Sequence, residues 1–391
     1  MAKRIIYLAC LALIFFLYPK DVPAITSHPT KSVSYPVRIA VLIDAPELNL
    51  KIRGSYHIYA LPVLKLLEEG VGLNNVIIKP AYSGLLMGSE SLKIYGVKIK
   101  TDEVADISID GRRFRGEIDI IRTENLKLLV INRLDIEAYI SGVLYHEVSH
   151  WWPMETLKAQ AIAARTFAIY KSLESGKNKD YDLTSDIYSQ VYGGRTSEKF
   201  RTNKAVEETA GKILVYKQEV LPAYFHATCG GYTEDASLLW NTNITPLKGR
   251  PCKYCKKSPH FNWSQKIPLN SMEERLNKNG YKIKDIIDIK TSSKDASGRI
   301  EMVSIIDSLG VEKIPANKFR LAMDPNVVRS TNFTVTIKDG AAIFNGYGWG
   351  HGVGMCQWGA YFMARSGLKA EDILRFYYPG SEIADLKDII E

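Results

Sequence analysis

The chain has 391 residues, of which 46% are hydrophobic and 24% are charged, and these values are typical of a globular protein with a substantial core. Its formal net charge of +8 serves solubility or an anionic partner, such as a bacterial wall polymer or a membrane surface. The Lys and Arg residues form no stripe interleaved with aromatic residues, which argues against a nucleic-acid-binding protein.

The N-terminus has the pattern of an export signal. Two basic residues precede an apolar run at 5–17, and small residues follow at 22–24, which predicts a secretory signal peptide over 1–24. The run is short for a transmembrane helix, and an uncleaved membrane anchor is the alternative interpretation. In either case we expect an extracytoplasmic, for example periplasmic, protein that meets a membrane only through this segment. A polar, proline-containing stretch at 25–36 predicts a linker.

The next part of the chain favours strands. Short apolar runs punctuated by Gly, Asn and Asp predict a β-rich segment over residues 37–110. Helical spacing then appears between 134 and 144, where Ile136, Ile140 and Val143 recur on one face.

A second, longer helix is expected after Pro153, which suits a first helical position. One face of this helix carries small side chains that allow close packing: Leu157, Ala161, Ala164 and Ala168. From residue 267 onward strands and short helices alternate, and no internal repeat is present. We therefore predict an α+β fold, with one large irregular domain at 111–385 that has a helical catalytic region and β-rich flanking segments.

Glu147 is a candidate general acid. It lies at the break between the two predicted helices, among histidines and aromatic residues that include Trp151. Cleavage of a glycosidic bond needs an acid, apolar walls raise a carboxyl pKa, and indoles stack on sugars. A surface glutamate beside a structural Trp pair is the alternative. His146, Glu147 and His150 also spell the H-E-x-x-H zinc-protease pattern, but that pattern needs a continuous helix, which the following Trp-Trp-Pro ends.

A second candidate is the glycine-rich stretch at 346–360, which presents His351, Gln357 and two tryptophans. Many glycines allow backbone conformations and close approaches that side chains forbid. Neither a dinucleotide nor a phosphate loop fits this spacing. The stretch is interpreted as the lining of a site, and a plain turn between a strand and a helix is the alternative.

The third candidate is a metal site. His226 and Cys229 form one short pair, and Cys252 and Cys255 form another, which predicts a structural zinc ion with four protein ligands. Disulfides are the alternative, because export favours them.

These segments together resemble the stage II sporulation protein D and amidase-enhancer family (SpoIID/LytB). The matching stretches are YISGVLYHE at 139–147, ETLKAQAIAARTF at 155–167, SQVY at 189–192, YFHATCGG at 224–231, GWGHGVGMCQWGA at 348–360 and ILRFYYPG at 373–380. The resemblance covers roughly residues 111–383 and implies a SpoIID-type domain whose catalytic glutamate is Glu147. His146, His150 and the Cys252/Cys255 pair depart from the usual family pattern, so the full ligand set does not follow from the resemblance.

The resemblance implies a peptidoglycan lytic transglycosylase. Such an enzyme cuts the MurNAc–GlcNAc bond of glycan strands stripped of stem peptides and forms 1,6-anhydro-MurNAc without water as nucleophile. The side chains predicted to bind substrate are Trp151, Arg165, Tyr192, His351 and Gln357. The rival function is a non-catalytic glycan-binding enhancer of an N-acetylmuramoyl-L-alanine amidase. The partners expected are therefore glycan strands and a cell-wall amidase.

Overall fold

The computed structural model describes residues 34–102, 105–176, 179–186 and 189–390. The predicted leader at 1–24 and most of the predicted linker at 25–36 lie outside these ranges. The described residues belong to one compact unit that mixes helices and strands, which confirms the α+β class. Among the helices described, none has the length and apolar character needed to span a membrane.

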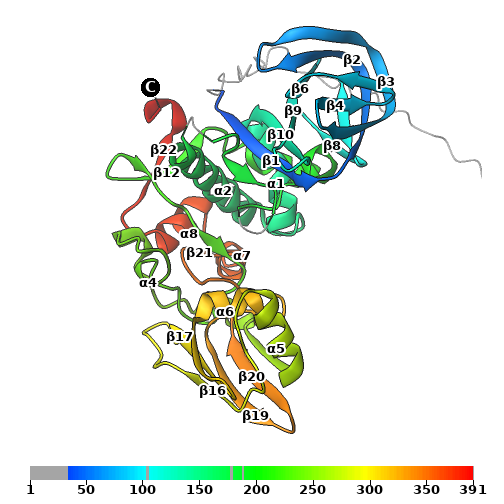
Figure 1. Cartoon of the computed structure of the whole chain (residues 1–391). Coiled ribbons are helices and arrows are strands. Elements are labelled where there is room, and N and C mark those ends of the chain that lie inside the picture. The colour runs from blue at the N-terminus through cyan, green and yellow to red at the C-terminus, as the bar shows by residue number, and fades with distance from the viewer. Residues whose placement is uncertain (1–33, 103–104, 177–178, 187–188, 391) are drawn as a thin grey trace, which may run out of the picture. The chain divides into compact units, whose positions relative to one another are not determined.

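Eleven of the described strands form one sheet (Figure 1). Its main path is β11 (Leu183–Thr184), β1 (Pro36–Ala45), β10 (Leu128–Asp135), β9 (Glu117–Arg122), β6 (Gly96–Thr101), β2 (Leu48–Leu61), β3 (Lys65–Ala81), β4 (Gly84–Met87) and β5 (Glu90–Leu92), with β7 (Asp106–Ile109) on β2 and β8 (Arg112–Phe114) on β7. Strands β9 and β10 pair with β6 and β1. The predicted division between residues 110 and 111 therefore falls inside this sheet.

Two helices follow the sheet. Helix α1 (Ile136–Glu147) begins after Asp135, whose carboxylate accepts the backbone N–H of Glu137, and it ends at Glu147 because Val148 is extended. Helix α2 (Met154–Ser175) begins directly after Pro153. The two helices form where the spacing of apolar residues predicted them.

Helix α2 belongs to two hydrophobic cores. The predicted face with Leu157, Ala161, Ala164 and Ala168 packs in the core shared with the large sheet. The opposite face, with Ala159 and Ile162, packs in a second core. That second core contains α7 (Gln357–Arg365), α8 (Ala370–Tyr377) and one face of a small sheet made of β13 (Glu219–Val220), β12 (Lys212–Tyr216) and β22 (Glu382–Asp385).

A third core lies within residues 263–344. Its two small sheets are β15 (Asn262–Pro268), β20 (Ala341–Tyr347) and β19 (Phe333–Lys338), and β16 (Asp288–Thr291), β17 (Met302–Asp307) and β18 (Gly310–Pro315). Helices α5 (Leu269–Lys278) and α6 (Ala316–Ala322) complete it, while α3 (Phe200–Glu207) and α4 (Ser237–Trp240) lie earlier in the chain. This segment is inserted between β14 (Phe225–His226) and β21 (Met355–Cys356), which pair in parallel with each other.

Candidate active site

The segments singled out in the sequence meet around a cavity of about 760 Å³. Its wall combines the end of α1, residues 189–191, β14, part of α6 and the glycine-rich stretch before α7. Aromatic rings cover much of this wall, namely Tyr145, Trp152, Phe167, Tyr224, Phe225, Trp240, Trp349 and Trp358. A cavity of this size with aromatic walls suits sugar rings, which stack on aromatic faces.

Glu147 lies at the C-terminal end of α1 and lines the cavity. Burial raises the pKa of its carboxyl from the usual range to about 7, although the Val191 backbone amide and the Gln357 side-chain amide act in the opposite direction. The unpaired carbonyls at a helix C-terminus also disfavour a negative charge there. A carboxyl with this pKa is partly protonated at neutral pH, as a general acid must be.

Gln357 is the first residue of α7, and its amide reaches the carboxyl of Glu147. Its Nε2 lies 3.5 Å from Glu147 Oε2 and 3.4 Å from Gln160 Oε1. The contact with Glu147 is long, so it orients the carboxyl without holding it strongly in the ionised form. The structure thus brings two sequence-predicted residues together in the cavity wall, from segments 210 positions apart in the chain.

The stretch at 346–360 needs its glycines because its backbone passes close to β14. Gly350 has φ +108°, and a Cβ atom there would lie 2.8 Å from His226 Cβ. Gly354 has φ +71°, and a Cβ atom there would lie 2.0 Å from the carbonyl oxygen of Tyr224. Both positions are closed to other residues by conformation and by space, which explains why the site carries this pattern.

His351 is held by the backbone at both ring nitrogens. Its Nδ1 accepts the backbone N–H of Val353 at 3.1 Å, so its Nε2 carries the proton and donates to the Phe225 carbonyl at 2.9 Å. Burial keeps its pKa well below the usual value, so the ring is neutral. His351 can therefore offer its ring edge to a ligand in the cavity, but neither nitrogen is free to transfer a proton.

His226 is different, because one of its nitrogens has no partner. Its Nδ1 donates to the Val353 carbonyl at 3.0 Å, and among the described atoms its buried Nε2 makes no hydrogen bond. Burial, with a smaller effect of the Arg299 charge, lowers its pKa to about 3. At neutral pH the Nε2 of His226 is therefore a buried acceptor without a partner among the described atoms, in a residue that lines the cavity.

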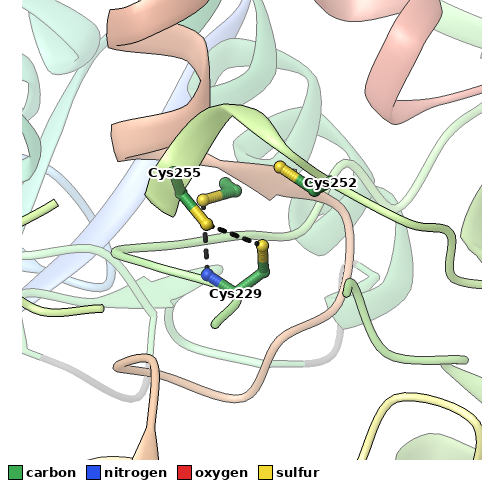
Figure 2. A group of neighbouring side chains, drawn as sticks. Cys229, Cys252 and Cys255 are labelled. Carbon is green, nitrogen blue, oxygen red and sulfur yellow. Dashed lines mark hydrogen bonds between the residues drawn. The ribbon is translucent and has the colours of Figure 1, made fainter. Parts of the chain in front are cut away.

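The group of side chains that could hold a metal ion differs from the predicted ligand set in one residue. The sulfurs of Cys229, Cys252, Cys255 and Cys356 lie within 4.8 Å of one another, and all four thiols are buried and free. Figure 2 shows the first three of these side chains next to one another. His226 is not part of this group, because its ring is turned to Val353 and the cavity. In the parallel pair of β14 and β21, Cys356 lies opposite His226 and supplies the fourth ligand atom instead.

Four buried thiols fit a metal ion of the zinc type, which prefers four soft ligands in a tetrahedron. The cluster also contacts its surroundings: the hydroxyl of Tyr377 lies 3.2 Å from Cys252 Sγ, and Cys356 Sγ accepts the backbone N–H groups of Cys229 and Gly359, each at 3.3 Å. Because Gln357 follows Cys356 directly, a metal here would fix the start of α7 and thereby the amide beside Glu147.

Three predicted substrate contacts lie away from the cavity. Trp151 is 76% exposed and does not line it, whereas its neighbour Trp152 does, with its ring 5.0 Å from that of Trp358. Arg165 and Tyr192 are buried side chains of the interior. The sequence could not separate these positions, because adjacent residues after a helix end point in different directions.

Arg165 and Tyr192 instead hold α1 in place. The guanidinium of Arg165 binds both carboxylate oxygens of Glu137, at 2.8 and 2.6 Å. The hydroxyl of Tyr192 donates to Asn132 Oδ1 at 2.7 Å, and its ring fills the space left by Gly142. These residues of the matching segments position the helix that carries Glu147, and we do not include them among the ligand contacts.

The H-E-x-x-H pattern does not form a metal site. Helix α1 ends at Glu147, so His150 does not follow His146 on one helical face. His146 Nε2 lies 2.6 Å from the hydroxyl of Ser197, while the ring of His150 packs against Tyr145 and Trp151.

Other residues of the cavity wall carry no sequence signal. Trp240, His260, Asn317 and Arg320 line the cavity, yet each is an isolated residue in a segment that no motif marks. Only the tertiary contacts of the segment between β14 and β21 bring them to the site.

Comparison with known proteins fits this arrangement. A model of the stage II sporulation protein family matches residues 124–216, and a model of a domain of unknown function (DUF8618) matches residues 251–354. The stage II sporulation protein D of Bacillus subtilis is 30% identical over 290 residues, which cover 68% of this chain and 79% of that protein.

The chain belongs to the stage II sporulation protein D family.

Two further proteins are similar to this chain. An uncharacterised protein of Brachyspira hyodysenteriae is 33% identical over 343 residues, which cover 88% of this chain and 91% of that protein. A protein named amidase enhancer from Bacillus subtilis is 29% identical over 348 residues, and the match covers 75% of this chain and 48% of that protein. The first match includes most of the inserted segment, so this segment is shared with a relative.

Proposed function

We propose that this protein is an exported lytic transglycosylase that cuts the MurNAc–GlcNAc bond of glycan strands without stem peptides, with Glu147 as its acid and base. One observation carries the proposal. Among the described residues that line the cavity, Glu147 is the only carboxylate, and its pKa is raised to about 7.

A single carboxylate limits the chemistry. Hydrolytic glycosidases use two carboxyl groups, one as the acid and one as the nucleophile or base. Here the second group is missing among the described residues of the wall. A reaction that returns the proton to the same carboxylate fits this site better than one that also has to activate water.

In the proposed reaction one residue, Glu147, both donates the proton and takes it back. Protonated Glu147 gives its proton to the glycosidic oxygen, and the bond between that oxygen and C1 of the muramic residue breaks. The C6 hydroxyl oxygen of the same residue then bonds to C1 as its proton passes to Glu147. The products are a new GlcNAc end and a 1,6-anhydro-MurNAc end, and Glu147 is protonated again for the next cycle.

The other wall residues serve binding and orientation. The amide of Gln357 holds the carboxyl from the side of α7, and the indoles of Trp152 and Trp349 offer stacking faces. No proton transfer is assigned to His351, because both of its ring nitrogens are bound to the backbone.

Zinc is proposed as the structural metal of the four-cysteine cluster. Cys229, Cys252, Cys255 and Cys356 would hold it with no open coordination position, so the ion would stabilise the fold rather than take part in the cleavage. An extracytoplasmic location belongs to this proposal, because its substrate lies there.

In the decisive experiment, purified protein is incubated with denuded glycan strands, and anhydro-muramic ends are detected by mass spectrometry. We expect anhydro ends with the wild-type protein and a rate about 10²- to 10⁴-fold lower with Glu147→Gln, which lacks a transferable proton. Glu219→Gln, an exposed position, is the matched control and should cut at the wild-type rate.

The amidase enhancer named among the relatives defines the rival outcome. If folded wild-type protein binds the strands, leaves them uncut and stimulates a wall amidase, the protein is an enhancer and not an enzyme. Anhydro ends formed equally by Glu147→Gln would remove Glu147 from the mechanism.

A further inference from the structure

Arg320 is a buried cation that faces the cavity. Helix α6 turns Asn317, Arg320 and Leu321 toward the cavity, positions that share one helical face. The opposite side of this short helix is anchored by Phe319 in the third core. Arg320 is only 8% exposed, so its charge is almost withdrawn from water at the edge of the site.

Within the described part of the chain, this charge has no partner. The only hydrogen bond of the side chain runs from Nε to the Arg329 carbonyl at 3.0 Å, and no carboxylate lies within 4.0 Å of the guanidinium. Burial, and to a smaller extent the like charge of Arg299, lower the pKa of Arg320 to about 10. A buried charge without a counter-charge is costly, and proteins keep one chiefly where a ligand supplies the opposite charge.

The guanidinium is also held in a fixed place. Arg329, whose carbonyl accepts from Arg320 Nε, stacks its own guanidinium over the Trp349 ring, with Cζ 5.0 Å from the centroid. Trp349 lines the same cavity. This one contact therefore fixes the position of two features: the end of Arg320 that makes no hydrogen bond, and an aromatic face for stacking. A site for a sugar with an acidic substituent requires both.

We propose that Arg320 binds the lactyl carboxylate of a muramic residue and selects glycan strands from which the stem peptide has been removed. This inference rests on the proposed function, since it takes a glycan strand as the ligand. In a denuded strand the lactyl group ends in a free carboxylate, which matches the planar fork of a guanidinium. In a strand that carries peptides the same carbon is an amide, which has no charge and adds bulk.

The site thus binds the negative charge that appears when the stem peptide is removed. The reaction that supplies this substrate must hydrolyse the amide bond between the lactyl group and the first amino acid, because that step creates the carboxylate. Loss of the charge pair is expected to weaken binding about 10- to 100-fold, in line with charge-assisted hydrogen bonds at buried sites.

The test compares Arg320→Gln with Lys318→Gln, an exposed lysine of the same helix whose loss also removes one positive charge. With denuded strands, Arg320→Gln should raise KM about 10- to 100-fold and leave kcat within a few-fold, while Lys318→Gln should change neither. Arg320→Lys should restore part of the loss, because it keeps the charge and loses the fork. Equal KM values for folded Arg320→Gln and wild type would overturn the proposal.

A second measurement does not depend on the folding of a variant. Wild-type protein is offered strands whose lactyl carboxylates have been converted to methylamides, and we expect the same 10- to 100-fold loss of binding. Equal binding of the two strands by the wild type would refute the role of the carboxylate. Displacement of bound strands by glycerol phosphate at lower concentration than by lactate would assign the cation to a phosphate polymer and overturn the proposal as well.

Strand binding is measured with Glu147→Gln, apart from cleavage by the wild type. The two measurements distinguish failure of the carboxylate site from failure of the proposed function. If the wild type leaves no anhydro ends but strand binding still depends on Arg320 and on the free carboxylate, the enzyme fails and the carboxylate site stands. If anhydro ends form equally from free and methylamidated strands with equal KM, the enzyme stands and the carboxylate site fails.

Discussion

The molecule buries ionisable groups in two contrasting ways. At the junction of α1 and α2, Arg165 is fully enclosed and bound twice to Glu137, which also accepts the backbone N–H of Gly211 at 2.9 Å. Around the cavity, Glu147 is partly buried and Arg320 is almost fully buried, and neither has a counter-charge among the described residues. The paired groups stabilise the helix that carries the site, and the unpaired groups are left for a ligand.

This contrast corrects an inference from the sequence. Arg165 lies in the most recognisable segment of the chain and was expected to bind substrate, whereas Arg320 lies in the inserted segment and has no motif around it. A matching segment marks the residues that build the site as well as those that touch the ligand. The partners of each side chain decide between these two roles.

The largest expected effect concerns the four thiols, whose missing partner would be a metal ion. Cys356→Ser should reduce the metal content well below one ion per chain and lower the free energy of unfolding by roughly 5 kcal/mol or more, because metal binding and folding are coupled. His226→Gln should keep the metal, since His226 is outside the group of ligand atoms. Elemental analysis and thermal unfolding of both variants measure this.

The reverse result, with metal lost from His226→Gln and kept in Cys356→Ser, would restore the ligand set expected from the sequence. Metal-free wild-type protein with two disulfides in mass spectrometry would replace the metal by covalent bonds.

The next effect contrasts the two arginines directly. Arg165→Gln should lower the free energy of unfolding by about 3–5 kcal/mol, because it removes a fully buried guanidinium and leaves the partly buried Glu137 carboxylate without its partner. Arg320→Gln should change it by less than about 1 kcal/mol or raise it, because it removes a buried charge that has no partner. Urea unfolding of the two variants gives both values.

The double variant Arg165→Met/Glu137→Gln is the control for the paired site and should recover part of the loss, since neither charge is then left alone. Equal destabilisation by Arg165→Gln and Arg320→Gln would show that the two environments do not differ as described.

The smallest effect is a pH dependence of stability. The pKa of Glu147 is raised to about 7 in the folded protein, so between about pH 4.3 and 7 the folded state binds more protons than the unfolded state. The contribution of this group to stability is therefore complete at low pH and falls as the pH rises through that window. Glu147→Gln lacks this loss and should become more stable than the wild type by about 1–3 kcal/mol at pH 8, with a smaller difference at pH 5.

Unfolding free energies of the two proteins at a series of pH values check this, and Glu219→Gln should follow the wild type throughout. A difference between Glu147→Gln and the wild type that does not change with pH would mean that the carboxyl ionises normally in the folded protein.

Local features of this protein follow from the residues of each segment alone. The 3.6-residue spacing predicted α1 and α2, and the two helices form with the break at Glu147 that the following Trp-Trp-Pro implied. The α+β class and the family also followed from the chain. Local periodicity and glycine spacing suffice here, because they depend on residues that are neighbours in the chain.

Long-range contacts, in contrast, determine which side chains share a site. Parallel pairing of β14 with β21 put Cys356 among the thiols and turned His226 toward the cavity, although 130 residues separate Cys356 from His226 in the chain. Packing of the inserted segment brought Arg320 to the cavity, while Arg165 was enclosed by its partner Glu137. Strand register and the presence of a counter-charge are properties of long-range contacts, and the spacing of residues along the sequence does not contain them.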